Sequence, residues 1–323
     1  STPSLYSNLE FIAAGSQGVV GSAYDAADKR SVAIKKLCNR ITRPHLAIRT
    51  ILEFKLLSSL NHPNIIRPLA VFTPQESKHN FRDVYVVMDL MKHTLQEIIE
   101  KVRVDQKQLS FFIYQILCAI NHLHRQGIIH RDLKPSNIAV DEKGVVKVLD
   151  FGMARIFDTI AASEMTGYVV TRYYRASEVV VGFLPDEDVF THLSPYSEKV
   201  DIWSIGCIFA EVITGKVLFL GSDRQDQWTQ IVRKMGTPND SYVYFNQASA
   251  SFFIIFMSQT VYNKIERANA LEWFATKLFS TKNHFSVSSA RHLISKMIDI
   301  DSKERYSAAE ALQHSYVKCW SRD

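Results

Sequence analysis

The first ninety residues alternate short runs of β-branched and aromatic residues with one segment of helical spacing. The strand-like runs are residues 9–12, 19–24, 32–37 and 84–88. Between them, residues 46–60 place apolar side chains at helical intervals, and His62-Pro63 ends that pattern. This pattern predicts a small, mostly antiparallel sheet accompanied by one helix.

From residue 92 onward the pattern becomes helical. Residues 109–126 carry apolar side chains at i, i+3, i+4 and i+7, and Gly127 supplies a C-terminal stop. Residues 200–214 are apolar on nearly every side, which predicts a buried central helix that ends at Gly215. Two later helices are predicted at residues 290–299 and 308–314.

The two halves of this pattern predict an α+β fold with two lobes. The N-lobe comprises residues 1–91, a small antiparallel β-sheet with one main helix, and the larger, mostly helical C-lobe comprises residues 92–323. A chain of 323 residues with 46% hydrophobic residues is large enough to bury a core in each lobe. Residues 89–91 form the predicted hinge.

Charge and cysteine content change this picture little. The net charge is +5, but basic and acidic residues are interleaved, so we expect a solvated mixed surface and no direct nucleic-acid partner. No apolar run approaches the roughly 20 residues that span a bilayer, and no signal-peptide pattern is present, so we expect no membrane association. Cysteines without metal-ligand spacing suggest reduced, mostly core-filling residues of an intracellular protein. These are Cys38, Cys118, Cys207 and Cys319.

The most specific candidate for chemistry is the segment 130–137, His-Arg-Asp-Leu-Lys-Pro-Ser-Asn. Transfer of a phosphoryl group from ATP requires a group that orients the attacking hydroxyl, a cation near the phosphate and metal ligands. Asp132 is predicted to orient or accept the substrate proton, Lys134 to neutralise phosphoryl charge and Asn137 to bind a metal ion. The alternative is a chance turn of loop-favouring residues, which eight residues in the expected order disfavour.

A second acidic candidate is the triplet Asp150-Phe151-Gly152, which follows a predicted strand at residues 145–149. The Asp150 carboxylate is a hard ligand suited to Mg²⁺. The triplet alone is too common to indicate a function. Its distance after the segment 130–137 is what makes it informative.

Residues 13–20, Ala-Ala-Gly-Ser-Gln-Gly-Val-Val, lie between two predicted strands. Glycines let a backbone approach phosphates without a Cβ clash, and a strand–turn–strand context differs from that of dinucleotide folds. Ala13 stands where such a loop usually has its first glycine, while Gly15 and Gly18 are present. Taken alone, this segment is better interpreted as a plain hairpin turn.

Lys35 lies in a strand, Val-Ala-Ile-Lys, that otherwise carries apolar residues. It is either a solvated charge on an edge strand or a lysine that binds the α- and β-phosphates. Glu53, on the following predicted helix, is the natural ion-pair partner for the second interpretation. A surface carboxylate is the alternative for Glu53, but its apolar neighbours indicate that it points into the lobe.

Together these motifs resemble the eukaryotic protein kinases, and more closely the mitogen-activated protein (MAP) kinases, over residues 5–320. The resemblance implies the two-lobed protein kinase fold, a Ser/Thr phosphotransferase activity, and ATP and Mg²⁺ as cofactors. It also implies nucleotide contacts that are spread over the glycine loop, the third strand, the hinge and the catalytic loop. These residues are Ile12, Ala13, Ala14, Gly15, Ser16, Gln17, Gly18, Val19, Val20, Ala33, Lys35, Met88, Asp89, Met91, Ser136, Asn137 and Ala139.

The resemblance further implies an activation loop at residues 150–178. In it, Thr166 and Tyr168 would be phosphorylated by an upstream dual-specificity MAP kinase kinase. Two phosphates add about three to four negative charges, which cationic side chains can order. Arg131 is the candidate partner of the Thr166 phosphate and Arg172 of the Tyr168 phosphate. An ordinary polar loop without regulation is the alternative.

Within the MAP kinases the sequence is similar to the c-Jun N-terminal kinase subfamily. Several short segments carry this similarity, but the Thr166-Gly167-Tyr168 triplet resembles a neighbouring stress-activated subfamily. The family implies a preference for Ser or Thr followed by Pro, with residues 169–175 shaping that pocket. It also implies protein substrates that include transcription factors, scaffold proteins, a monomeric state and a cytoplasmic and nuclear location.

Four departures from the family pattern stand out. The usual Ala-Pro-Glu reads Ala176-Ser177-Glu178, although the resemblance still pairs Glu178 with Arg305 in a buried ion pair. Residues 183–198 form an insertion of about ten residues by comparison with compact loops. Residues 240–286 are shorter and less regular than the expected insert. The chain ends without the usual extension, which puts an acidic docking groove in doubt.

Two other functions compete with an active protein kinase. A pseudokinase scaffold would share the fold, but the complete set Lys35, Glu53, Asp132, Asn137 and Asp150 disfavours it. A small-molecule kinase of similar fold is disfavoured because its substrate needs no extended platform after the activation loop.

Overall fold

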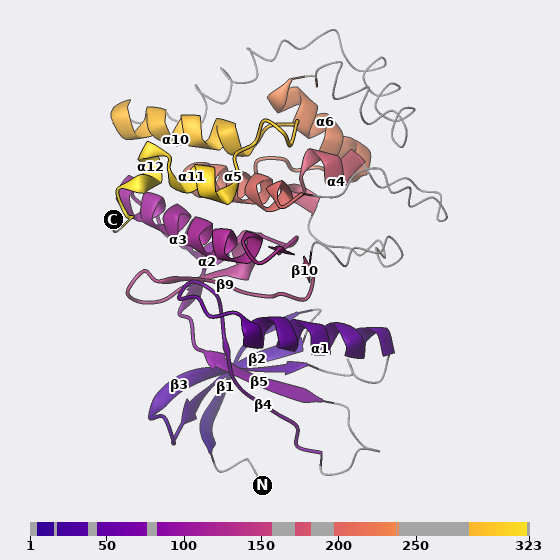
Figure 1. Ribbon diagram of the computed structural model, residues 1–323. Coiled ribbons are helices and arrows are strands. Elements are labelled where there is room, and N and C mark those ends of the chain that lie inside the picture. The colour runs from indigo at the N-terminus through magenta and orange to yellow at the C-terminus, as the bar shows by residue number, and fades with distance from the viewer. Residues whose placement is uncertain are drawn as a thin grey trace. The chain divides into compact units, whose positions relative to one another are not determined.

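The computed structural model describes most of the chain (Figure 1). The described residues are 5–15, 18–37, 44–75, 83–156, 172–181, 197–236, 238 and 284–321. The chain forms two compact units: Ser1–Thr94 with Ile138–Met153, and Leu95–Asn137 with Ala154–Asp323. Residues 138–153 thus lie with the N-terminal unit. The lobe boundary predicted between residues 91 and 92 stays a prediction.

The first unit contains an antiparallel five-stranded sheet with the strand order β1-β2-β3-β5-β4. Its strands are β1 (Tyr6–Gly15), β2 (Gly18–Asp25), β3 (Arg30–Leu37), β4 (Pro68–Phe72) and β5 (Val84–Asp89). The four strands expected from the sequence are confirmed. β4 was not predicted, because it has only five residues and begins with a proline.

The two faces of this sheet carry separate apolar clusters. One face joins Val32, Ile34 and Val87, and the aromatic rings of Phe72 and Tyr85 stack beside them at a centroid distance of 5.2 Å. The opposite face joins Leu37, Val84 and Val86, with Phe54 of helix α1 (Pro44–Ser59) packed against it. Figure 1 shows α1 alongside the sheet. Side chains of β3 alternate between the two faces, so Lys35 belongs to the face that α1 covers.

A smaller sheet completes the first unit. Its order is β6-β8-β9, formed by β6 (His93–Thr94), β8 (Ile138–Val140) and β9 (Val146–Val148). Asn64 connects this sheet to the segment before β4, because its Nδ2 donates to Val146 O at 2.8 Å and its carbonyl accepts from Val148 N at 2.8 Å. The residue pair Ile65 and Val148 extends the connection as a parallel bridge.

The second unit is mainly helical. Its helices are α2 (Leu95–Lys101), α3 (Gln106–His124), α4 (Ser177–Val181), α5 (Lys199–Thr214), α6 (Arg224–Met235), α10 (His284–Met297), α11 (Ala308–Leu312) and α12 (Ser315–Lys318). It also contains the 3₁₀ turns η3 (Pro135–Asn137) and η6 (Arg172–Tyr174) and the paired strands β7 (Ile128–Ile129) and β10 (Arg155–Ile156). α5 is buried from Val200 to Glu211, as predicted, and ends at Gly215 in the left-handed conformation.

Local sequence explains where α3 begins. Asp105 accepts a hydrogen bond from Gln108 N, and the Gln108 side chain accepts one from Asp105 N. This capping box starts α3 at Gln106, three residues before the predicted start. Within the described residues, α3 is the longest helix and none has the length and apolarity needed to cross a membrane.

The cysteines differ in part from the expectation that they fill the core. Cys207 is buried in α5 and Cys118 is half-buried in α3, but Cys319 is exposed after α12. Cys38 lies outside the described residues. Cys319 is the exception among the described cysteines to the expectation that they are mostly core-filling.

Gly18→Ala is expected to lower the melting temperature, measured by thermal unfolding. Gly18 has a φ of +140°, and a Cβ there would lie 2.0 Å from the Lys36 carbonyl oxygen. The strained backbone costs about 1–3 kcal/mol, and the overlap with β3 adds to it. Gly127→Ala is the matched control, since Gly127 has a φ of +69° but no atom near the added methyl. An equal drop in melting temperature in both variants would contradict the close approach of β2 to β3.

Candidate active site

The side chains of the predicted catalytic loop are hydrogen-bonded to one another. Asp132 is only 8% exposed, and its Oδ2 accepts from Lys134 Nζ at 2.9 Å and from Asn137 Nδ2 at 2.9 Å. Asn137 Nδ2 also donates to the Asp132 carbonyl at 2.8 Å. The backbone turn of η3 supports this arrangement, because Asn137 N donates to Lys134 O at 2.9 Å. The three residues assigned separate roles from the sequence therefore form one preorganised group.

The backbone of this loop is held by a residue that the sequence analysis did not select, Asp201 of α5. Its Oδ2 accepts from His130 N, and its Oδ1 accepts from Arg131 N, both at 2.9 Å. His124 of α3 adds a third contact, with Nε2 at 2.9 Å from Asp201 Oδ2. Arg131 has a φ of +68°, an uncommon conformation that these contacts help to maintain.

The charge of Asp201 is stabilised inside the protein. Its side chain is 0% exposed. Burial alone would raise the pKa of Asp201, but the hydrogen bonds from His124 and from Arg131 N outweigh burial and hold the pKa below its ordinary value. The sequence held a signal for this role, since Asp201 is an acidic residue in a helix that is otherwise apolar on nearly every side.

In the first unit, Lys35 belongs to a face of β3 and Glu53 to the helix that packs against that face. Lys35 projects from the face of β3 that α1 covers, and Glu53 belongs to α1 with 8% of its surface exposed. The buried position of Glu53 confirms that it does not point into solvent. Since a buried carboxylate requires compensation, this burial favours the phosphate-binding interpretation of Lys35 over a solvated charge.

Asp150 follows β9 in the first unit and has a φ of +59°. Its Oδ1 accepts from Gly152 N at 3.2 Å, which closes a tight local turn, and Phe151 between them is buried. A non-glycine residue with positive φ is uncommon and is often found at functional sites. The predicted metal ligand therefore has a backbone conformation that the surrounding fold imposes.

The predicted glycine loop is the hairpin between β1 and β2, in which Gly15 pairs with Gly18. The strand–turn–strand context is confirmed, while Ser16 and Gln17 lie outside the described residues. Gly18 also has a structural role, because β3 leaves no room for a side chain there. Of the other predicted nucleotide contacts, Ala33 and Ala139 are buried, Val20, Met88, Asp89 and Met91 are half-buried, and Ile12, Ala13, Ala14, Val19 and Ser136 are exposed.

The side chain of Asp89 contacts other protein groups. Its Oδ1 lies 3.0 Å from Arg30 Nη1 and its Oδ2 lies 3.3 Å from Lys147 Nζ. Asp89 thereby connects the five-stranded sheet to β9. Any contact of Asp89 with a nucleotide is consequently assigned to its backbone.

The oxygen donors of Asn137 and of Asp150, each considered within its own unit, are of the type that Mg²⁺ accepts. Asn137 uses Nδ2 for Asp132, which leaves Oδ1 as the amide atom able to ligate a metal. Asp150 supplies a carboxylate, and carboxylate and amide oxygens are ligands that Mg²⁺ accepts. Asn137 lies in the second unit and Asp150 in the first.

The predicted phosphorylation sites Thr166 and Tyr168 lie outside the described residues, as do residues 183–196 of the insertion and the chain from 239 to 283. The described segment that follows the phosphorylation sites is anchored to α5. Tyr174 OH donates to Glu211 Oε2 at 2.6 Å, and Ser204 Oγ donates to Tyr174 O at 2.8 Å. Burial raises the pKa of Tyr174 and that of Glu211. Arg172 Nη1 donates to Ser222 O.

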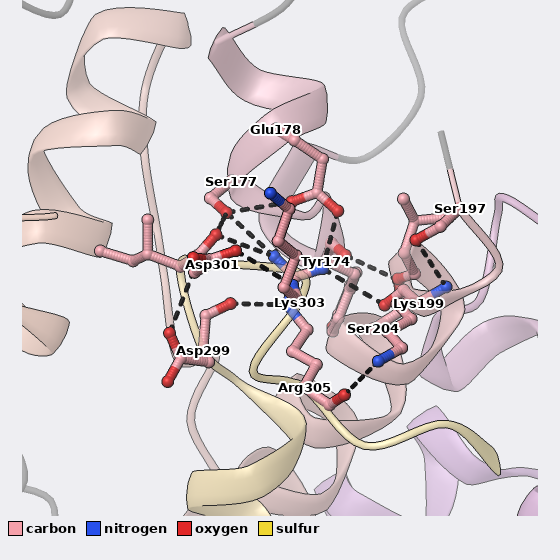
Figure 2. Close-up of polar contacts among 12 residues, drawn as sticks. Tyr174, Ser177, Glu178, Ser197, Lys199, Ser204, Asp299, Asp301, Lys303 and Arg305 are labelled. Carbon is pink, nitrogen blue, oxygen red and sulfur yellow. Dashed lines mark hydrogen bonds and ion pairs between the residues drawn. The ribbon is translucent and has the colours of Figure 1, made fainter. Parts of the chain in front are cut away.

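The ion pair implied for Glu178 and Arg305 is present and bidentate (Figure 2). Arg305 Nη1 lies 2.7 Å from Glu178 Oε1, and Nη2 lies 2.6 Å from Oε2. Arg305 Nε donates to Asp299 O at 2.5 Å, and its guanidinium carbon lies 4.9 Å from the centre of the Trp203 ring. The Arg305 side chain is 0% exposed, so its donors are satisfied within the protein.

Comparison with known proteins identifies the class. Residues 6–317 match the family described as protein kinase domain, and the chain belongs to this family. It is 46% identical over 321 residues to GLH-binding kinase 1 of Caenorhabditis elegans, covering 99% of this chain and 80% of that protein. It is 43% identical to stress-activated protein kinase jnk-1 of C. elegans, covering 98% of this chain and 65% of the relative. Stress-activated protein kinase JNK of Drosophila melanogaster is also 43% identical, with 98% and 81% covered.

These similarities narrow the class further. The chain is a stress-activated MAP kinase-like Ser/Thr protein kinase, similar to the c-Jun N-terminal kinases. Protein kinases of this family use ATP and Mg²⁺. The two-lobed fold and the phosphotransferase activity expected from the sequence are confirmed.

Proposed function

We propose that this kinase is switched on by phosphorylation of Thr166 and Tyr168 and that it modifies Ser or Thr followed by Pro. The preorganised loop carries this proposal. Asp132, Lys134 and Asn137 are already hydrogen-bonded in a geometry suited to phosphoryl transfer. Because this loop is already formed, we expect phosphorylation to control how the substrate reaches and aligns with it, and not to assemble the loop.

Arg131 provides a route from phosphate to this loop. It is adjacent to Asp132, and Asp201 fixes its backbone amide. A phosphate on Thr166 that binds the Arg131 guanidinium would attach the activation loop to a backbone that is already rigid. The Arg172 guanidinium would bind the Tyr168 phosphate.

The remaining parts of the proposal follow from the family. Protein substrates that include transcription factors, an upstream dual-specificity kinase, scaffold proteins, a monomeric state and a cytoplasmic and nuclear location are proposed together. Asp132, Lys134, Lys35 and Glu53 are the proposed catalytic group, and Asn137 and Asp150 are the proposed ligands of Mg²⁺.

The test compares phosphorylated chain with Thr166→Ala on paired peptides that carry Ser-Pro or Ser-Ala. After treatment with an upstream MAP kinase kinase, the unsubstituted chain is expected to phosphorylate the Ser-Pro peptide in preference. Thr166→Ala should lower kcat/KM about 5–150-fold, the range of typical coupling free energies. Intact mass measurement confirms the phosphate content of each sample.

Ser163→Ala is the control, because it removes a hydroxyl from the same loop outside the Thr-Gly-Tyr triplet. Full activity in Thr166→Ala would contradict the switch. Equal rates on the two peptides would contradict the preference for Pro. ATP binding without any transfer would favour the scaffold function instead.

A further inference from the structure

Ser177 is a buried polar residue at a position where the family resemblance leads one to expect proline. It is the first residue of α4 and is 0% exposed. A buried hydroxyl is costly unless it is hydrogen-bonded. Its contacts therefore show what this chain gains from serine.

The Ser177 hydroxyl joins the Glu178–Arg305 ion pair to a third segment (Figure 2). It accepts from Arg305 Nη2 at 3.1 Å and donates to the Ile300 carbonyl at 2.8 Å. Glu178 Oε2 lies 3.0 Å from the same oxygen and is the alternative acceptor for its single proton. A proline ring could make none of these contacts.

Ser177 directly follows the segment Arg172–Ala176, which lies between the phosphorylation sites and α4. At its start, this segment is attached to α5 through Tyr174, whose hydroxyl and carbonyl bind Glu211 and Ser204. At its end, the Ala176 carbonyl accepts from the amides of Val179 and Val180, both at 3.0 Å. Ser177 then attaches this end to residues 300–305.

We propose that Ser177 is a positioning residue for the peptide substrate. Its hydroxyl fixes the downstream end of the segment Arg172–Ala176, and the Tyr174 contacts fix the upstream end. The inference rests on the proposed function, since residues 169–175 are expected to shape the pocket for the Pro that follows the phosphorylated Ser or Thr. Ser177 touches neither substrate nor nucleotide and acts through the backbone of Ala176.

The test is steady-state kinetics of Ser177→Ala with the Ser-Pro peptide, after phosphorylation by the upstream kinase. The KM for peptide is expected to rise about three- to tenfold, the effect of one or two hydrogen bonds. The KM for ATP and kcat are expected to stay unchanged, because the variant leaves the catalytic loop intact.

Ser110→Ala is the matched control. Ser110 in α3 is also a buried hydroxyl with two partners, donating to Tyr316 O at 2.5 Å and accepting from Trp320 Nε1 at 2.9 Å. Loss of the Ser110 hydroxyl should lower thermal stability about as much as Ser177→Ala does, yet the KM for peptide should not change. An equal KM in Ser177→Ala and the unsubstituted chain, or an equal rise in Ser110→Ala, would overturn the inference.

Two further measurements keep the inference testable. If Ser177→Ala does not fold, Ser177→Pro removes the hydroxyl with a residue favoured at the first position of a helix, and its kinetics are judged by the same criterion. If the unsubstituted chain transfers no phosphate, the proposed function fails. Hydrogen exchange at residues 173–176 then decides the positioning role: faster exchange in Ser177→Ala than in Ser110→Ala supports it, and equal exchange overturns it.

Discussion

An Asp132→Asn variant is expected to bind ATP normally while phosphoryl transfer slows by about 10²–10⁴-fold, the usual contribution of a positioned acid or base. The amide cannot accept the substrate proton. Its one amide oxygen can still accept from Lys134 and Asn137, which share Oδ2 of Asp132, so the loop should keep its geometry. Single-turnover transfer to a Ser-Pro peptide, measured beside nucleotide affinity, separates chemistry from binding.

Asp105→Asn is the control for this substitution. Asp105 caps α3, and asparagine caps a helix about as well as aspartate, so folding and transfer should both be retained. Transfer that persists within a few-fold in Asp132→Asn would show that another group orients the substrate hydroxyl. A loss of nucleotide affinity equal to the loss of transfer would show that Asp132 acts mainly on the nucleotide.

Arg305→Ala is expected to destabilise the second unit by about 3–5 kcal/mol, the usual result of removing one partner of a buried ion pair. The substitution leaves the Glu178 carboxylate and the carbonyls of Asp299 and Ile300 without their cationic donor. It also removes the guanidinium from the Trp203 ring. Calorimetric unfolding should show a lower transition temperature for the helical unit.

Arg305→Lys should give a transition temperature between those of the unsubstituted chain and Arg305→Ala, since lysine keeps the charge but not the bidentate geometry. Lys92→Ala is the control. The ion pair of Lys92 with Glu142 is exposed on both sides, and exposed pairs contribute little to stability. If Arg305→Ala and Lys92→Ala lowered the transition temperature equally, the buried pair would have no special role in stability.

Local patterns predicted those features that depend on neighbours in sequence. The period-two strands, the amphipathic α3 and the apolar α5 follow from spacing alone. The chemistry of the catalytic loop follows from residues 130–137, because its main hydrogen bonds join residues at most five positions apart. The Glu178–Arg305 pair spans 127 positions and required the family resemblance.

Other features were missed for two different reasons. For α6 the signal was available, since Trp228, Ile231, Val232 and Met235 follow helical spacing within a mostly polar segment. Asp201 and Ser177 are different, because their roles depend on contacts with residues about 70 and 123 positions away. No pattern along the chain specifies such contacts, although a lone acidic or polar residue in an apolar stretch marks where to look for them.

The attachment of the catalytic loop to Asp201 has a consequence for heat inactivation. The amides of His130 and Arg131 are bound by a side chain of α5, a helix that is buried from Val200 to Glu211. The loop therefore melts when α5 melts, and activity should disappear at the transition of the helical unit even if the sheet unit unfolds at another temperature. Stabilising the core around α5 would then extend the working temperature of the enzyme without any change at the loop itself.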